Sequence, residues 1–134
     1  MRLKEKVVLV SMAAAMAVAA PAEAEHHKPS GYTTLSESAC RFTAAAQWTG
    51  HPTTARVKLL LGANFGGGPV TIAETDTAPT FDADGRGSGT ATWTLSPAPD
   101  NAAFWSEAWL VDANGDVLEV LRNKSAKPLR ARCA

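Results

Sequence analysis

The sequence has few of the residues on which most catalytic and metal sites depend. Its 134 residues include 2 cysteines and 3 histidines. The only histidine after residue 27 is His51, which lies in a Gly-His-Pro segment typical of a turn. A catalytic nucleophile needs a base within hydrogen-bond reach, and no Cys-His pair or serine elbow with a partner histidine can be drawn here. The sequence therefore favours a protein that is not an enzyme, and it indicates no cofactor.

The chain also lacks an excess of charge of either sign. It has 13 Lys and Arg residues and 13 Asp and Glu residues, so the formal net charge is zero. A protein that grips nucleic acid by its phosphates needs a surplus of basic side chains. We therefore expect no nucleic-acid partner.

Long hydrophobic runs are confined to the first 24 residues. A basic start, an apolar run and small residues follow one another there: Arg2, Lys4 and Lys6, then residues 7–20, then Ala22-Glu23-Ala24. This order is typical of a secretory signal peptide, so residues 1–24 are predicted to be a leader removed on export. After Ala24 no apolar run is long enough for a membrane helix. We expect a secreted protein with no membrane contact after cleavage, periplasmic if the source has an outer membrane.

Export changes the interpretation of the two cysteines. Cys40 and Cys133 would meet an oxidising compartment, where disulfides form and persist. A bond between them would enclose nearly the whole remaining domain, and a loop of that size contributes about 4 to 5 kcal/mol in the chain-entropy model. The alternative of two free thiols or a metal site lacks a Cys-x-x-Cys pair or nearby histidines. We therefore predict one Cys40–Cys133 disulfide.

From Cys40 onward, apolar residues alternate with polar ones. Cys40, Phe42, Ala44, Ala46 and Trp48 share one face of an extended segment, which is the pattern of a half-buried strand. Similar segments, separated by Gly, Pro and Asn-Gly turn signals, follow at 57–61, 70–74, 90–95, 104–111, 116–122 and 129–133. About seven short strands and no convincing helix predict an all-β, antiparallel sandwich over residues 35–134. Residues 25–34 are polar and are expected to form a flexible lead-in.

Three features of residues 35–134 suggest a family. They are Cys40-x-Phe42 followed by Trp48, Asp84-Gly85 before Trp93, and the segment 111–116 between two late strands. In this layout the chain resembles the small secreted immunoglobulin-like domains of bacteria. The resemblance implies an immunoglobulin-like sandwich closed by one disulfide. It departs from the antibody pattern because the second cysteine is in the last strand, and it implies no particular function.

The most distinctive candidate surface contains Trp105, Glu107 and Trp109, which share one face of the strand predicted at 104–111. If the alternate residues, Phe104 among them, line the core, these three form an aromatic platform with an acid. Such a surface suits stacking of sugar rings or docking of a protein. If the tryptophans point inward instead, they are large core residues, as aromatics in sandwiches often are. The sequence leaves both readings open for this pair, whereas Trp48 and Trp93 are expected in the core.

A second candidate site depends on where the leader is cut. Cleavage after Ala24 would leave a chain that begins Glu25-His26-His27. A free amine, two backbone amides and a third-residue imidazole can surround Cu(II) or Ni(II) in a plane, and His26 could add a ligand. The alternative is that two histidines lie in a tail by chance.

Three short motifs have both a functional and a structural interpretation. The segments 82–85 and 112–116 resemble incomplete calcium loops, but Asp, Asn and Gly are also what hairpin turns select. Asn123-Lys124-Ser125 fits the glycosylation sequon.

The sequence thus predicts an exported, single-domain sandwich that acts as a non-catalytic binding or structural module. Its partner is expected to be a macromolecule, either protein or carbohydrate. The alternatives are Cu(II) or Ni(II) binding through Glu25-His26-His27, and carbohydrate or protein binding through an exposed Trp105/Trp109 face.

Overall fold

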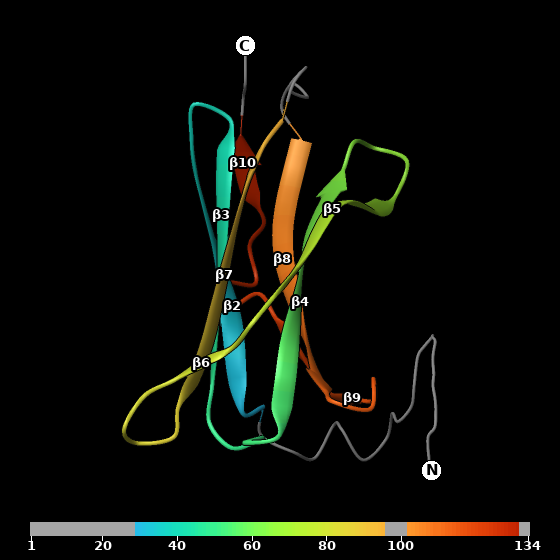
Figure 1. Ribbon diagram of the computed structural model, residues 1–134. Helices are drawn as coiled ribbons and strands as arrows, with labels where there is room; N and C mark the ends of the chain where they lie inside the picture. The colour runs from blue at the N-terminus through green and yellow to red at the C-terminus, as the bar shows by residue number, and fades with distance from the viewer. Residues whose placement is uncertain (1–28, 96–101, 132–134) are drawn as a thin grey trace.

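The computed structural model describes residues 29–95 and 102–131 of the chain. Those residues form nine strands and no helix, arranged as two antiparallel sheets (Figure 1). The strands are β2 (Gly31–Ser38), β3 (Arg41–Trp48), β4 (Thr54–Asn64), β5 (Pro69–Thr77), β6 (Thr80–Phe81), β7 (Gly87–Thr94), β8 (Ala102–Asp112), β9 (Val117–Arg122) and β10 (Leu129–Ala131). The prediction of an all-β, antiparallel, two-sheet fold is confirmed, but the number of strands is nine and not about seven, because β2 and β6 were not expected. In the same stretches of chain, there is no helix that could span a membrane.

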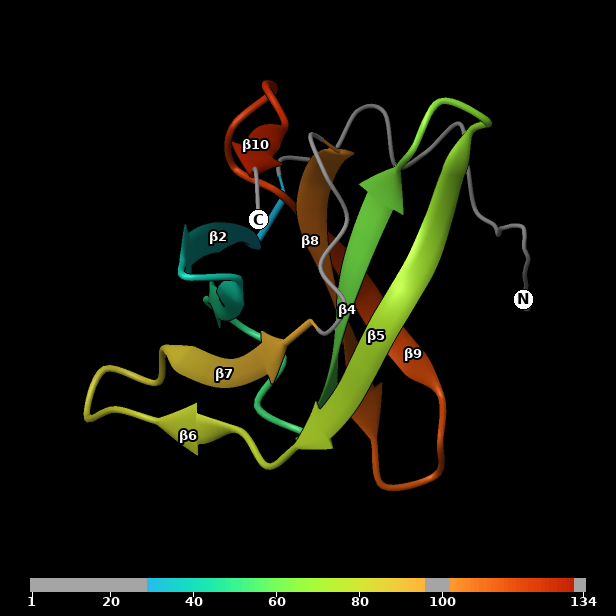
Figure 2. The ribbon, with the colours of Figure 1, turned by 90° about the horizontal axis from the view of Figure 1, so that it is seen from above.

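The two sheets form separate layers when the molecule is seen from above (Figure 2). One has four strands in the order β2-β3-β7-β6. The other has five, in the order β10-β8-β4-β5, with β9 also paired to β8. Since β4 occupies one edge of β8 along almost its whole length, β9 and β10 share the other edge, one after the other. The edge between β9 and β10 is therefore interrupted, and residues 123–128 leave the sheet there.

The segment expected as a lead-in is partly a strand. β2 begins at Gly31 and pairs with the whole of β3, so residues 31–34 belong to the sandwich and not to a flexible lead-in. Polar residues can form an edge strand because only one face needs to be buried. Thr33 is fully buried, and Leu35 packs against the core. The leader and residues 25–28 lie outside the described part of the chain.

The core lies between the sheets and follows the predicted alternation. Phe42, Ala44, Ala46 and Trp48 of β3 are all buried, as are the alternate residues Val57, Leu59 and Leu61 of β4. Phe42 and Phe104 connect the two layers, with ring centroids 4.5 Å apart. Alternation of apolar residues was therefore a sufficient guide to the buried face of these two strands.

Trp48 and Trp93, both expected in the core, differ in burial. Trp48 is 2% exposed and lies between Gly31 and Gly87, its cross-strand neighbours. A Cβ atom at Gly87 would meet the indole at 2.3 Å, so only glycine fits beside this ring. Trp93 is half-buried, and its Nε1 donates to Thr75 Oγ1 at 2.9 Å across the two sheets. The prediction therefore holds for Trp48 and only partly for Trp93.

Cys40 is buried, but it lies in a turn and not at the start of a strand. Ala39 and Cys40 form the two-residue β2–β3 hairpin loop, and both have positive φ values, 51° and 63°. Two successive positive φ angles define the type I′ turn, whose twist matches that of the flanking strands. Cys40 packs in a core cluster that includes Ala131 of β10. Cys133 lies outside the described residues, so the Cys40–Cys133 bond stays a prediction.

Candidate functional site

The side chains of β8 alternate between the core and the outer face of the five-stranded sheet. Phe104, Ala108 and Leu110 are fully buried. Trp105 and Trp109 therefore lie on the outer face, and each is half-buried. Both tryptophans thus lie on the outer face, as an aromatic platform requires, but each ring is in contact with neighbouring residues.

Trp105 is half-buried because it lies over a glycine of the next strand. Gly62 of β4 is its cross-strand partner, and a Cβ atom there would be 2.6 Å from the indole Nε1. A glycine inside a strand often marks such a close approach. The register of β4 and β5 also shifts between Leu61 and Gly62, which marks an irregularity at this point. The ring of Trp105 thus packs against the backbone of β4 at Gly62, and part of the ring stays accessible.

Trp109 is covered by charged neighbours. The Lys58 Nζ atom lies 5.5 Å from its ring centroid, a cation–π contact, and its own Nε1 donates to Glu107 Oε1 at 3.3 Å. A cation thus lies over this half-buried ring, whereas Trp105 lies over a glycine. The two tryptophans therefore do not form one continuous platform.

Glu107 lies between the tryptophans and pairs with an arginine from β9. The cross-strand register sets Arg122 opposite Glu107, and Arg122 Nη1 donates to Glu107 Oε2. The glutamate side chain is 25% exposed, whereas the arginine side chain is 76% exposed. Glu107 is therefore a partly buried acid whose charge is compensated.

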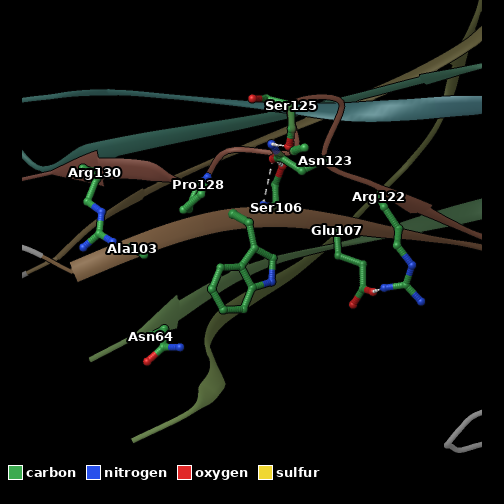
Figure 3. Close-up of a pocket in the computed structure, with 11 residues that line it drawn as sticks. Asn64, Ala103, Ser106, Glu107, Arg122, Asn123, Ser125, Pro128 and Arg130 are labelled. Carbon is green, nitrogen blue, oxygen red and sulfur yellow. Dashed lines mark hydrogen bonds and ion pairs between the residues drawn. The ribbon is translucent and has the colours of Figure 1, made fainter. Parts of the chain in front are cut away.

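A groove of about 470 Å³ opens beside Trp105. It forms where the chain leaves the edge of β8, because residues 123–128 stand away from the sheet between β9 and β10. Figure 3 shows Arg130 and Arg122 toward opposite ends of the groove, with Asn64 on the side of β4. Its lining includes Asn64, Trp105, Glu107, Arg122, Pro128 and Arg130.

A buried polar network holds the chain that borders the groove. With no strand paired to it at this point, β8 would leave the Ser106 backbone N–H unsatisfied, and Asn123 Oδ1 accepts from that group at 3.1 Å. The same oxygen accepts from Ser106 Oγ at 2.8 Å, and Ser106 Oγ also contacts Thr33 Oγ1 of β2 at 2.8 Å. Lys124 N donates to Thr33 O at 2.7 Å. The network joins both sheets to the groove.

The Asn123-Lys124-Ser125 sequon is part of this network. Asn123 Oδ1 accepts from Ser106, and Asn123 Nδ2 donates to the Ser125 carbonyl at 3.2 Å. A glycan on Nδ2 would compete with these contacts. The structure therefore favours a structural role for this asparagine.

The two segments that resemble calcium loops are two copies of one turn. Asp82 Oδ1 accepts from the N–H groups of Asp84 and Arg86, and Asp112 Oδ1 accepts from those of Asn114 and Asp116, all at 2.9 Å. The pKa of Asp82 is lowered, chiefly by the backbone N–H of Arg86. Desolvation opposes this shift, and the N–H of Asp84 and the Arg86 side chain add to it. Among the residues described, no group of three or more His, Cys, Asp or Glu gathers to hold a metal. These aspartates shape hairpin turns.

His51 is not a simple solvent-exposed turn residue. Its Nε2 lies 2.8 Å from Glu119 Oε1 of β9, and Ser30 Oγ donates to the same carboxylate oxygen. Glu119 thus stands between the serine and the histidine. In an activated serine the histidine lies between the hydroxyl and the acid, so His51 is not placed to take a proton from Ser30.

The remaining sequence-based candidates lie outside the described residues. These are the proposed metal ligands Glu25, His26 and His27, and the second cysteine, Cys133. The residues that sequence reasoning missed are Gly62, Asn64, Arg122 and Arg130. Gly62, a glycine within an apolar strand, was the available signal of close approach. Counting outward from the Asn114-Gly115 turn would have set Arg122 near Glu107.

No family model matches this chain, and neither a curated protein nor a solved structure is similar enough to count as a match.

Proposed function

We propose that this protein is an exported, non-catalytic binding module of the immunoglobulin-like type that holds a saccharide in the groove beside Trp105. The observation that carries the proposal is a half-buried indole on a rigid sheet face, bordering an open groove with polar side chains on its rim.

The strand order supports the immunoglobulin-like type. Constant-type domains have strands A, B, E and D in one sheet and C, F and G in the other. Here the order β2-β3-β7-β6 corresponds to A-B-E-D, and β4, β8 and the interrupted pair β9/β10 correspond to C-F-G. β5 adds a strand beside β4, where variable-type domains also add strands.

The chemistry of the groove supports a saccharide over a purely apolar ligand. The face of an indole carries partial negative charge and attracts the C–H groups of a sugar ring, which carry partial positive charge. The planar polar groups of Asn64, Glu107 and Arg122 border the same groove and match the vicinal hydroxyls of a sugar. Gly62 fixes the ring position before binding, which reduces the entropy cost of recognition.

The arrangement of titratable groups supports a non-catalytic role. Glu107 is held by Arg122 and by Trp109, and Glu119 is held by His51 and Ser30. Both carboxylates are therefore engaged by hydrogen bonds or ion pairs within the fold. Binding, and not proton transfer, is the chemistry to which the groove is suited.

The position of Cys40 supports the disulfide. Cys40 and Ala131 pack in one buried cluster, and Cys133 follows Ala131 by two residues, a reach of about 7 Å. A Cys40–Cys133 bond would tie the β2–β3 turn to the end of the last strand. It also fits a protein that folds after export.

The direct test is isothermal titration calorimetry of the purified protein with short oligosaccharides of glucose, N-acetylglucosamine, galactose and galacturonic acid. At least one should bind, and Trp105→Ala should weaken that binding by about tenfold or more, as expected for a central aromatic anchor. Trp109→Ala is the matched control, since it lies on the same face and outside the groove lining.

Two results would overturn the proposal. One is the absence of binding to every oligosaccharide. The other is equal loss of affinity in Trp105→Ala and Trp109→Ala, which would separate binding from the groove.

A further inference from the structure

We infer that the groove selects acidic saccharides, with Arg130 as the residue that pairs with the sugar carboxylate. This inference rests on the proposed function and specifies its ligand class. It depends on the charge of the groove wall, on the pairing of its two arginines and on the spacing between Arg130 and Trp105.

The wall of the groove is basic although the chain as a whole is neutral. Two arginines, Arg122 and Arg130, belong to its lining, whereas Lys124 and Lys127 of the same segment do not. Among the described residues, Glu107 is the one acid that lines the groove. The local excess of positive charge favours an anionic ligand, and a concave surface with low-dielectric walls strengthens that preference.

The two arginines of the groove differ in how they are compensated. Arg122 is paired with Glu107. Arg130 is exposed, lines the groove and forms no ion pair with any residue in 29–95 or 102–131. An exposed guanidinium without a partner can accept a carboxylate in the bidentate geometry that arginine favours.

The register of β10 puts Arg130 within reach of a sugar stacked on Trp105. Arg130 pairs with Ala103, and Ala103 and Trp105 are same-face neighbours on β8. Two residues along a strand cover about 7 Å. A single ring over Trp105 therefore brings a substituent on its rim toward Arg130, whereas Arg122 lies toward the other end of the groove (Figure 3).

The test compares one sugar with and without its charge. Oligogalacturonate and its fully methyl-esterified form have the same rings and differ in the carboxylates. In calorimetry at low salt the acid should bind about tenfold or more tightly than the ester, because a charge-assisted pair is stronger than a neutral contact. Added salt should weaken binding of the acid and leave the ester unchanged.

Arg130→Gln should abolish the difference between acid and ester while leaving binding of the ester intact. Arg41→Gln is the matched control, since Arg41 is an exposed arginine on β3 of the other sheet. Its affinities should equal those of the unmodified protein.

The possible failures can be told apart. Equal affinity for acid and ester, with binding still lost in Trp105→Ala, would overturn the acidic preference and leave the saccharide groove standing. A preference for the acid that persists in Arg130→Gln would overturn the role of Arg130. Absence of binding to either form, together with all other oligosaccharides, would overturn both the inference and the proposed function.

Discussion

Two tryptophans of this protein lie against a glycine of the neighbouring strand, one inside the sandwich and one outside it. Trp48 of β3 is opposite Gly87 of β7, and Trp105 of β8 is opposite Gly62 of β4. In each pair a Cβ atom on the glycine would come within 2.6 Å of the indole. The local device is the same in both sheets: a large aromatic ring covers a strand glycine.

The difference lies in what the rest of the fold does with each ring. Trp48 is 2% exposed, and within the described chain its buried Nε1 has no hydrogen-bond partner, so packing alone holds it. Trp105 keeps part of its surface at a groove with polar neighbours. The first ring stabilises the sandwich, and the second is positioned for recognition. The comparison separates a residue that is needed for the fold from one that is available for a ligand.

The largest effect is expected at the inner pair. Gly87→Ala should lower the free energy of unfolding by about 3 kcal/mol, because the Cβ would force a fully packed ring to move. Urea denaturation followed by tryptophan fluorescence measures this change.

Gly67→Ala is the control for that substitution. A Cβ at Gly67 meets no atom within 4 Å, and the backbone there does not have a positive φ. The free energy of unfolding of Gly67→Ala should therefore be nearly that of the unmodified protein. Similar midpoints for Gly87→Ala and Gly67→Ala would show that Trp48 is loosely packed.

A smaller loss of stability and a larger loss of binding are expected at the outer pair. Gly62→Ala should cost about 1 to 2 kcal/mol, because the displaced Trp105 ring can turn toward solvent and does not strain the core. The affinity of this variant for the best-bound oligosaccharide should fall by about tenfold, since the Trp105 ring is displaced from its position over residue 62. Denaturation and calorimetry on one preparation measure both quantities.

The contrast between the pairs would fail if Gly62→Ala kept full affinity. In that case the contact with Gly62 would not position Trp105 for a ligand. Reduced quenching of Trp105 fluorescence by iodide on ligand binding, judged against Trp105→Phe, gives an independent check on the ring.

The smallest effect is expected in the turn that leads into Gly87. Hydrogen bonds from Arg86 and Asp84 lower the pKa of Asp82 in the folded protein. A lowered folded-state pKa contributes stability that is present above the ordinary aspartate pKa of about 4 and is lost as the pH falls through the folded value.

Asp82→Asn should therefore lower stability slightly at neutral pH and flatten the fall in stability below about pH 4, so that the two proteins converge in acid. Thermal denaturation across this acidic range measures the slope. A slope identical to that of the unmodified protein would show that the turn contributes nothing to acid sensitivity.

Sequence reasoning succeeded where local periodicity carries the information. The alternation in 41–48 identified the buried face of β3, and the same reasoning assigned Trp105, Glu107 and Trp109 to one face of β8. It failed for β2, because a polar edge strand has no apolar alternation to detect. It also treated Trp105 and Trp109 as equivalent, whereas one lies over a glycine and the other under a lysine.

The groove was not predictable because its walls come from residues far apart in the sequence. Asn64 reaches it by strand register, and Arg130 reaches it only because the chain leaves the sheet after Arg122 and returns at Leu129. Asn123 makes that departure possible by satisfying the Ser106 N–H, a contact across 17 residues. No local pattern in the sequence signals such a substitution of a side chain for a strand.

The sequence by itself determined the class of fold and the inner and outer faces of most strands, because a period of two in apolar residues is a local consequence of strand geometry. The tertiary structure decided which tryptophan packs in the core and which borders a groove. It also brought two arginines to the ends of that groove. Those outcomes depend on which strands pair and in what register, and pairing is a property of the whole chain.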